Sequence, residues 1–355
     1  MTILSHNDQY PYINLPNHMI NTNTKGHINC LKASLSGLAL LGAVCISAQA
    51  KDGPTLDNLT DGGDTDYFIE IQQVFAKPDM ENARAFNAEI GPPRDIDFNY
   101  DAESSSRLIF GFIKPTTGVG FRARYWSFEG DSSPLAGSDT NGLIATDAIS
   151  IIAGGGIDDV DTLSVTHTID ADVLDLETIT RHQDHDLLTS LGVRVTQFGQ
   201  EYNLSSDEGG LNSQLDFIGL GPTASIEGTY QLGQSDFSLF GNARVSLLVG
   251  QRELDSNNVD TVNGGVPTIS DDDIEIVYNA DVQAGVEWRP ARFQDVGFFT
   301  RAGLEYQYWG NVGNLRDISS PAIDDTIPGG TTSGNSDYDG DIDFIGFFLS
   351  AGFSF

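Results

Sequence analysis

The chain has 355 residues and a formal net charge of −33, from 51 acidic and 18 basic residues. So acidic a surface excludes nucleic acid as a partner, because that binding needs clustered lysines and arginines, and it suits a cation-attracting exterior. Hydrophobic residues make up 39% of the chain, which is too many for a disordered protein, while 39 glycines disfavour long helices.

The N-terminal 50 residues have the features of an export signal. Lys25 and Lys32 precede an apolar run over 35–46, which is shorter than the roughly 20 residues of a membrane-spanning helix. Ala48 and Ala50 then form the small-x-small pattern of a cleavage site. We therefore expect residues 1–50 to be a signal peptide with an N-terminal extension, removed after Ala50.

Several details of this segment stay open. Translation starts at Met1 or at Met19, and a buried helix or a lipoprotein signal at Cys45 are the alternatives to a cleaved signal. Both cysteines, Cys30 and Cys45, precede the predicted cleavage site. The mature chain is therefore expected to form no disulfide and to offer no thiolate for catalysis or metal binding. Residues 51–66 are predicted to be a short periplasmic segment.

After residue 66 apolar and polar residues alternate with period two, which is typical of strands with two different faces. Over 274–289, for example, isoleucine, tyrosine, alanine, valine and tryptophan occupy the even positions. The pattern predicts ten strands, at 67–75, 104–112, 118–128, 163–178, 186–199, 214–231, 236–250, 273–289, 296–310 and 341–355. Most match the roughly 9–11 residues that cross a bilayer at a tilt, or exceed it. Pro222 cannot donate to a ladder, so we expect a bulge or break there.

The predicted connections alternate between short and long. The short ones are 114–117, the region near 181–184, 233–235 and 290–295; the long ones are 76–103, 129–162, 200–213, 251–272 and 311–340. Outer-membrane barrels combine short periplasmic turns, long extracellular loops and an even number of strands. The predicted fold over 67–355 is therefore all-β, a transmembrane antiparallel β-barrel of about ten strands with long acidic extracellular loops. Eight to twelve strands remain open, because 143–156 is apolar enough for an extra hairpin or a plug.

Aromatic residues cluster at the ends of the predicted strands. Aromatic side chains that contact lipid on one side and water on the other form girdles at both faces of a membrane. The predicted girdle consists of Tyr125, Trp126, Trp288, Tyr308, Trp309, Phe353 and Phe355. A closing strand that ends in Phe355 also resembles the signal that outer-membrane assembly machinery reads, so this machinery and membrane lipid are the predicted partners. A homo-oligomer stays open.

Six stretches along the chain, taken in order, carry a resemblance to a known family: VGFRARYW (119–126), VLDLE (173–177), GLGPT (219–223), LFGNARVSLLVG (239–250), EW (287–288) and RAGLEYQYW (301–309). They resemble the pore-forming outer-membrane proteins related to the Legionella major outer membrane protein, particularly members from planctomycete-type bacteria. The resemblance implies a pore-forming barrel in the bacterial outer membrane. It brings no catalytic residues, and the acidic loops match no part of it.

Charged residues on the polar faces of the predicted strands are expected to line the barrel lumen. A charge at the lipid midplane costs about 2–4 kcal/mol for arginine, so inward placement is favoured. The predicted lumen residues are Arg107, Arg122, Arg124, Arg194, Arg244, Arg289, Arg301, Glu227, Glu275, Asp281, Glu287 and Glu305. They would either set the selectivity of a channel or fill and brace a narrow barrel.

The other candidate sites are weak. The loop from Asn335 imitates a calcium loop, but Gly346 stands where its bidentate glutamate belongs, so we expect at most loose calcium or magnesium binding. His182 and His185 lie in a predicted turn without further ligands. His167 is the mid-strand histidine and has no serine partner, so no catalytic residue, cofactor or enzyme activity is predicted.

The predicted function is a porin-like passive channel for small hydrophilic solutes, with diffusion through a charged lumen. The alternative is a closed barrel that acts as a structural anchor or as a surface interaction platform through its acidic loops. A secreted soluble β-protein is the third class, and it would need no detergent for extraction.

Overall fold

The computed structural model describes residues 65–80, 84–88, 94–143, 160–182, 186–206, 209–260, 269–290, 296–313 and 340–355. The predicted signal peptide, with Ala48 and Ala50, lies outside the described residues, as does nearly all of 51–66. Within the described residues, no helix is long and apolar enough to cross a membrane.

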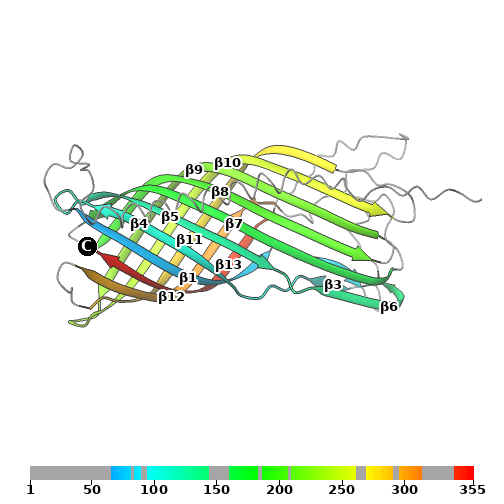
Figure 1. Cartoon of the computed structure of the whole chain (residues 1–355), viewed down its shortest axis with the longest axis horizontal. Coiled ribbons are helices and arrows are strands. Elements are labelled where there is room, and N and C mark those ends of the chain that lie inside the picture. The colour runs from blue at the N-terminus through cyan, green and yellow to red at the C-terminus, as the bar shows by residue number, and fades with distance from the viewer. Residues whose placement is uncertain are drawn as a thin grey trace, which may run out of the picture.

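The chain forms a closed antiparallel β-barrel (Figure 1). The strands are β1 (Asp66–Met80), β2 (Arg84–Ala88), β3 (Arg94–Asp97), β4 (Glu103–Ile113), β5 (Val119–Asp131), β6 (Leu135–Leu143), β7 (Val160–His182), β8 (Leu187–Ser206), β9 (Gly209–Gln231), β10 (Phe237–Asp260), β11 (Ile269–Trp288), β12 (Gly297–Gly310) and β13 (Ile342–Ser354). Eleven strands share one sheet, and the pairing of β5 with β7 closes ten of them into a ring, outside which β6 lies. β2 and β3 form a separate hairpin. The ten predicted strands and the predicted fold class are confirmed.

Two of the connections predicted to be long loops are largely strand. β8 and β9 stay paired through 200–213, so that only residues 207 and 208 separate them. β10 and β11 likewise extend to Asp260 and back to Ile269. The prediction of loops there was wrong, because it read abundant Asp, Asn and Ser as loop, although Tyr202, Leu204 and Leu254 alternate with polar residues and are buried.

The predicted bulge or break at Pro222 takes neither form, but the ladder is interrupted there on one side. β9 pairs with β8 through Val193 and Pro222 without a change of register. The ladder between β9 and β10 only skips two pairs, opposite Leu247 and Leu248, and then resumes in the same register. A Cβ at the neighbouring Gly221 would lie 1.9 Å from the carbonyl oxygen of Leu247, so glycine lets β10 pass closely beside the proline.

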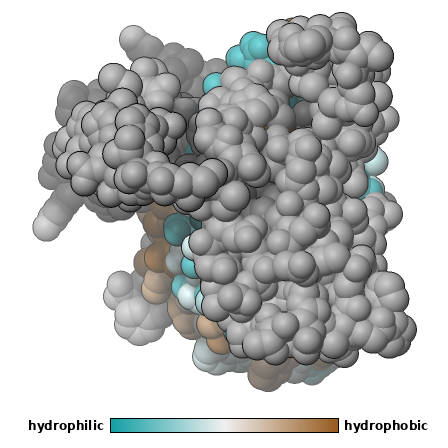
Figure 2. Space-filling view, turned by 90° about the vertical axis from the view of Figure 1, so that its right-hand side faces the viewer, coloured by the Kyte–Doolittle hydropathy of each residue, from teal (hydrophilic) through white to brown (hydrophobic). Residues whose placement is uncertain are grey.

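Outward-facing side chains form an apolar band around the part of the barrel nearest the short turns between strands. We call this part the lower part and the opposite end the upper part. Leu304 and Leu191 are 71% and 67% exposed on this surface. Away from the short turns, the next outward positions become polar: Lys77, Ser127, Asp172, Gln197, Asp216, Gln251 and Asp272. On the visible part of the barrel surface in Figure 2, brown hydrophobic residues gather in a patch that is bordered by teal hydrophilic residues. The band has the composition of a lipid-facing surface.

Tyrosines mark the boundary of this band. The Tyr125 hydroxyl donates to Asp172 Oδ1 at 2.6 Å, and the Tyr306 hydroxyl donates to Asp343 Oδ1 at 2.9 Å. Each ring lies on the apolar side and each hydroxyl reaches an acid on the polar side, as expected at a membrane interface.

β6 to β11 continue past the band as a wall on one side of the barrel, and Figure 1 shows β7 to β10 projecting there. We call this part the strand wall; it comprises 135–143, 160–172, 197–206, 209–216, 251–260 and 269–277. From Gln251 to Asp260, β10 alone adds about 33 Å along the strand at ~3.3 Å per residue.

Candidate functional site: the barrel interior

Within the band, the barrel interior holds a layer of paired charges, which we call the ion-pair layer. Its members are Arg107, Arg122, Arg124, Arg194, Arg244 and Arg301, with Glu70, Asp175, Glu177, Glu227, Asp281, Glu287 and Glu305. Alternation places them there, because each lies on the strand face opposite the apolar band. Nearly equal numbers of guanidinium and carboxylate groups leave the layer close to neutral.

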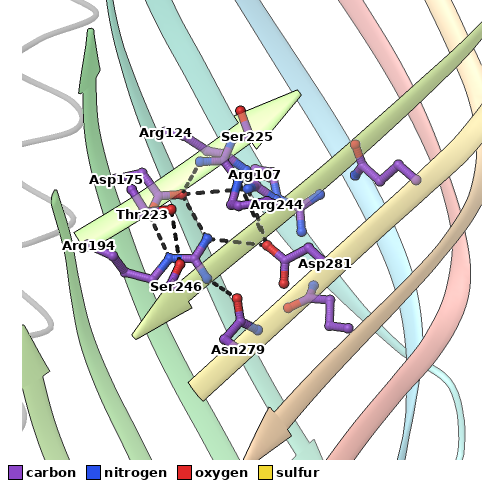
Figure 3. Close-up of polar contacts among 12 residues, drawn as sticks. Arg107, Arg124, Asp175, Arg194, Thr223, Ser225, Arg244, Ser246, Asn279 and Asp281 are labelled. Atoms are coloured by element: carbon purple, nitrogen blue, oxygen red, sulfur yellow. Dashed lines mark hydrogen bonds and ion pairs between the residues drawn. The ribbon is translucent and has the colours of Figure 1, made fainter. Parts of the chain in front are cut away.

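The upper part of this layer is shared among strands on opposite sides of the barrel (Figure 3). Arg194 of β8 donates to Asp175 Oδ1 of β7 at 2.6 Å and to Asp281 Oδ2 of β11 at 3.2 Å, and it also bonds Asn279. Arg244 of β10 lies 3.2 Å from Asp175 and also contacts Glu177. Side chains from four strands thus meet near the barrel axis.

The lower part of the layer is centred on Arg301. Its guanidinium lies 2.8 Å from Glu287, 3.1 Å from Glu227 and 3.3 Å from Glu70. Glu227 also pairs with Arg122 at 3.2 Å. Every group here has a partner of opposite sign, which is what allows charges to be buried without a prohibitive desolvation cost.

Little space remains between these side chains. The cavity beside Arg124, Arg194 and Asp281 has a volume of about 10 Å³. That is room for roughly one water molecule. The arrangement can hold the barrel strands together and can exclude solutes; it leaves no solute-sized space at this cavity.

An aromatic layer lies above the ion-pair layer. The Phe344 ring packs against Phe128 at 4.9 Å, Trp126 at 5.8 Å and Phe198 at 6.5 Å between centroids. Phe198 in turn lies 5.8 Å from Trp309. These residues come from β5, β8, β12 and β13, so the contacts cross the interior.

This layer corrects two of the predicted girdle residues. Trp126 and Trp309 are 2% and 0% exposed and point inward. Their polar edges are satisfied there, since Trp126 Nε1 donates to Ser105 Oγ at 3.0 Å and Trp309 Nε1 to Gln307 Oε1 at 3.3 Å. The other predicted girdle residues lie on the outward face: Tyr125, Trp288, Tyr308, Phe353 and Phe355.

Residues Phe98 and Tyr100, which follow β3, pack onto the inner side of the strand wall. The Tyr100 hydroxyl lies 2.6 Å from Nδ1 of His167, and the Phe98 ring lies 5.2 Å from the His167 ring and 5.9 Å from Tyr202. We call this contact the lid. Burial lowers the pKa of His167 to about 4, so the imidazole is neutral at pH 7.

The remaining predicted lumen residues lie toward the two ends of the interior. Arg289, with a side chain 51% exposed, is at the short-turn end and contacts Glu287 at 2.9 Å. Glu275 pairs with Arg252 at 2.8 Å at the other end. Glu70, Asp175 and Glu177 were missed by the sequence prediction. The signal was present, because Asp175 and Glu177 alternate with the outward Leu174 and Leu176.

No group of three or more histidine, cysteine, aspartate or glutamate residues in the described ranges could hold a metal ion. His182 Nε2 lies 3.0 Å from the Thr189 hydroxyl. His185 and the loop from Asn335 to Asp339 lie outside the described residues, and Gly346 is part of β13.

The model of one protein family matches residues 64–355, and its description is the Legionella pneumophila major outer membrane protein precursor. The chain belongs to this family. The family places the barrel in the bacterial outer membrane. Outer-membrane barrels generally keep their short turns on the periplasmic side, so the strand wall at the opposite end is expected to face outside. A search of curated proteins finds no match.

Solved structures with similar folds are outer-membrane β-barrels. The outer membrane protease OmpT from Escherichia coli is 12% identical, with a TM-score of 0.39, over 82% of this chain and 96% of its own. The toluene transporter TodX from Pseudomonas putida is 7% identical, with a TM-score of 0.27, over 83% and 90%. Similarities of this size give no information about what this chain binds or does.

Proposed function

We propose that this protein is a closed outer-membrane barrel that anchors the strand wall at the cell surface as an interaction platform. The observation that carries the proposal is a filled interior. The ion-pair layer, the aromatic layer and the lid lie one above another. The first two include contacts between strands that are not neighbours in the sheet, and in the lid Tyr100 contacts His167 of β7.

The second support is the division of the strands into two parts. Their lower parts carry the apolar band, whereas their upper parts carry polar outward residues, of which Gln251 and Asp272 are exposed while Gln197 and Asp216 are buried. A barrel that only sealed itself in the bilayer would need strands of about 9–11 residues. β7, β9 and β10 have 23, 23 and 24 residues. The additional length builds a rigid surface in water.

A porin-like passive channel for small hydrophilic solutes is the second candidate. It is favoured by the charged character of the interior within the band, which resembles the lining of a selective pore. Arg301 touches three carboxylates, and Arg244 lies within 4.0 Å of three as well, so that ion pairs can exchange without unfolding the barrel. Conduction would also require Phe344 and its aromatic neighbours to move.

Ion conductance of the full chain in planar lipid bilayers separates the two candidates. Insertion is verified first by flotation of the same preparation with liposomes. We expect inserted protein to give no channel steps. Regular steps from inserted wild-type protein would reject the closed barrel and support the channel.

We also propose that assembly machinery reads the closing strand. Phe355 and Tyr67 exchange two backbone hydrogen bonds, at 2.8 and 3.0 Å, at the seam where β13 meets β1. Removal of Phe355 should lower the amount of assembled protein in the outer membrane, and unchanged assembly would contradict this role. The proposal includes no enzymatic activity and no bound cofactor.

A further inference from the structure

β11 extends beyond its last partner in β12. The final pair between them is Tyr278 with Gly310. Residues 269–277 continue to pair with β10 on one side, and on the other side they have no strand partner among the described residues. One margin of the strand wall is therefore an open β-edge, which we call the β11 edge.

The direction of the free backbone groups follows from one hydrogen bond. Asn311 Nδ2 donates to the carbonyl oxygen of Ile276 at 2.9 Å, so Ile276 faces the β12 side. Backbone groups of alternate residues in an antiparallel strand point the same way. The N–H and C=O groups of Ile274 and Asp272 therefore face the β11 edge, while Asn311 ends it at the membrane side.

The β11 edge is accessible. The side chain of Ile274 is 80% exposed and that of Ile276 is 52% exposed, while Asp272 and Asp273 are exposed as well. The outer end of β1 differs, because it passes its last pair with β4 and then contains Pro78. A proline on an edge removes a donor and blocks pairing. No proline occurs in 269–277.

Charge decides which strand the β11 edge can accept. The exposed carboxylates of Asp272 and Asp273 lie along it, whereas the nearby Glu275 is already paired with Arg252. A second copy of this chain, with a net charge of −33, is repelled. A cationic strand is attracted, and like charges on an edge are a known means of suppressing self-pairing.

From this geometry we infer that the β11 edge binds an extended cationic peptide segment by strand addition. Main-chain hydrogen bonds to Asp272 and Ile274 supply the affinity, and the acidic side chains select positive charge. Tyr278, at the start of the edge, contacts Tyr308 at the band boundary, so the bound segment lies just above the outer leaflet. The inference rests on the proposed role of the strand wall as an interaction platform.

The test uses the full chain in detergent micelles and a labelled eight-residue peptide that alternates lysine and valine. Fluorescence anisotropy should show saturable binding, and the same peptide with glutamate in place of lysine should not bind. Ile274→Pro removes the N–H that faces the open edge and should weaken binding about tenfold or more. Ile274→Ala keeps that N–H and should stay within about twofold of wild type.

Thermal unfolding followed by circular dichroism checks that both variants fold, since proline is tolerated where a strand has no partner. Hydrogen exchange provides an independent readout, in which the peptide should slow exchange in the segment that contains Asp272 and Ile274. Equal affinity for the proline and alanine variants, or no binding of the lysine peptide, would overturn the inference. Neither result depends on conductance, so failure here leaves the closed barrel standing.

Discussion

Arg107 of β4 and Glu305 of β12 form a two-bonded ion pair across the barrel interior, with Nη2 2.6 Å from Oε1 and Nη1 2.8 Å from Oε2. Two other strands, β1 and β13, separate β4 from β12 in the sheet. The pair therefore braces the barrel from within. Its side chains are 0% and 3% exposed, so each charge depends on the other for its burial.

Loss of one partner should cost more than loss of both. Arg107→Met leaves the buried Glu305 carboxylate without its ion-pair partner and should lower the free energy of unfolding by about 3–5 kcal/mol. Arg107→Met with Glu305→Leu removes both charges and should be more stable than the single variant. Urea unfolding in detergent or vesicles measures the cycle, and additive losses in the double variant would contradict an ion-pair brace.

The apolar band predicts a depth-dependent penalty for a charge on β10. Val245, 59% exposed, faces lipid within the band, while Gln251 faces outward just above it. Val245→Arg should destabilise the folded barrel by about 2–4 kcal/mol in lipid vesicles, and Gln251→Arg by about 0–1 kcal/mol. Equal effects of the two substitutions would mean that the band has been placed wrongly.

The three tryptophans should differ in their contact with lipid. Trp288 is 38% exposed on the outward face, whereas Trp126 and Trp309 are buried inside. Brominated lipids should therefore quench Trp288 fluorescence, and Trp288→Phe should abolish the quenching. Strong residual quenching in that variant would show that Trp126 or Trp309 contacts lipid, as the girdle prediction had it.

Alternation alone predicted most of the ion-pair layer. Arg122 and Arg124 share one face of their strand, and Trp126 shares it too, so the same alternation placed this tryptophan inside. The girdle prediction went wrong because it weighed residue type above position in the alternation. Trp309 was misplaced for the same reason, since it shares a face with Glu305 and Gln307.

Other features lie beyond what alternation can predict. Which carboxylate pairs with which guanidinium depends on the tilt of the strands, as in the pairing of Arg122 with Glu227 across the interior. The strand wall was missed because the prediction gave weight to the many polar residues of 200–213, although Tyr202 and Leu204 keep an alternating buried face there.

The lid should loosen in acid. His167 has a pKa of about 4 when buried, below its usual value of about 6.5, so an opened lid binds the proton more readily. The lid is therefore most stable above about pH 6.5 and loses stability as the pH falls toward 4. Hydrogen exchange of residues 97–102, corrected for intrinsic rates, should rise between pH 7 and pH 5. His167→Gln should remove that dependence, and a pH response that persists in it would rule out His167 as the cause.

Thiol labelling tests the filled interior most directly. The two cysteines, Cys30 and Cys45, are replaced by serine. Single cysteines are then placed at Gln72, which is 2% exposed and accepts a hydrogen bond from Arg107 of the ion-pair layer, or at the outward Gln251. A charged, water-soluble thiol reagent should modify Gln251→Cys in the folded barrel and Gln72→Cys only after unfolding. Equal labelling of the two positions in folded protein would show that water and solutes fill the barrel, contrary to a closed interior.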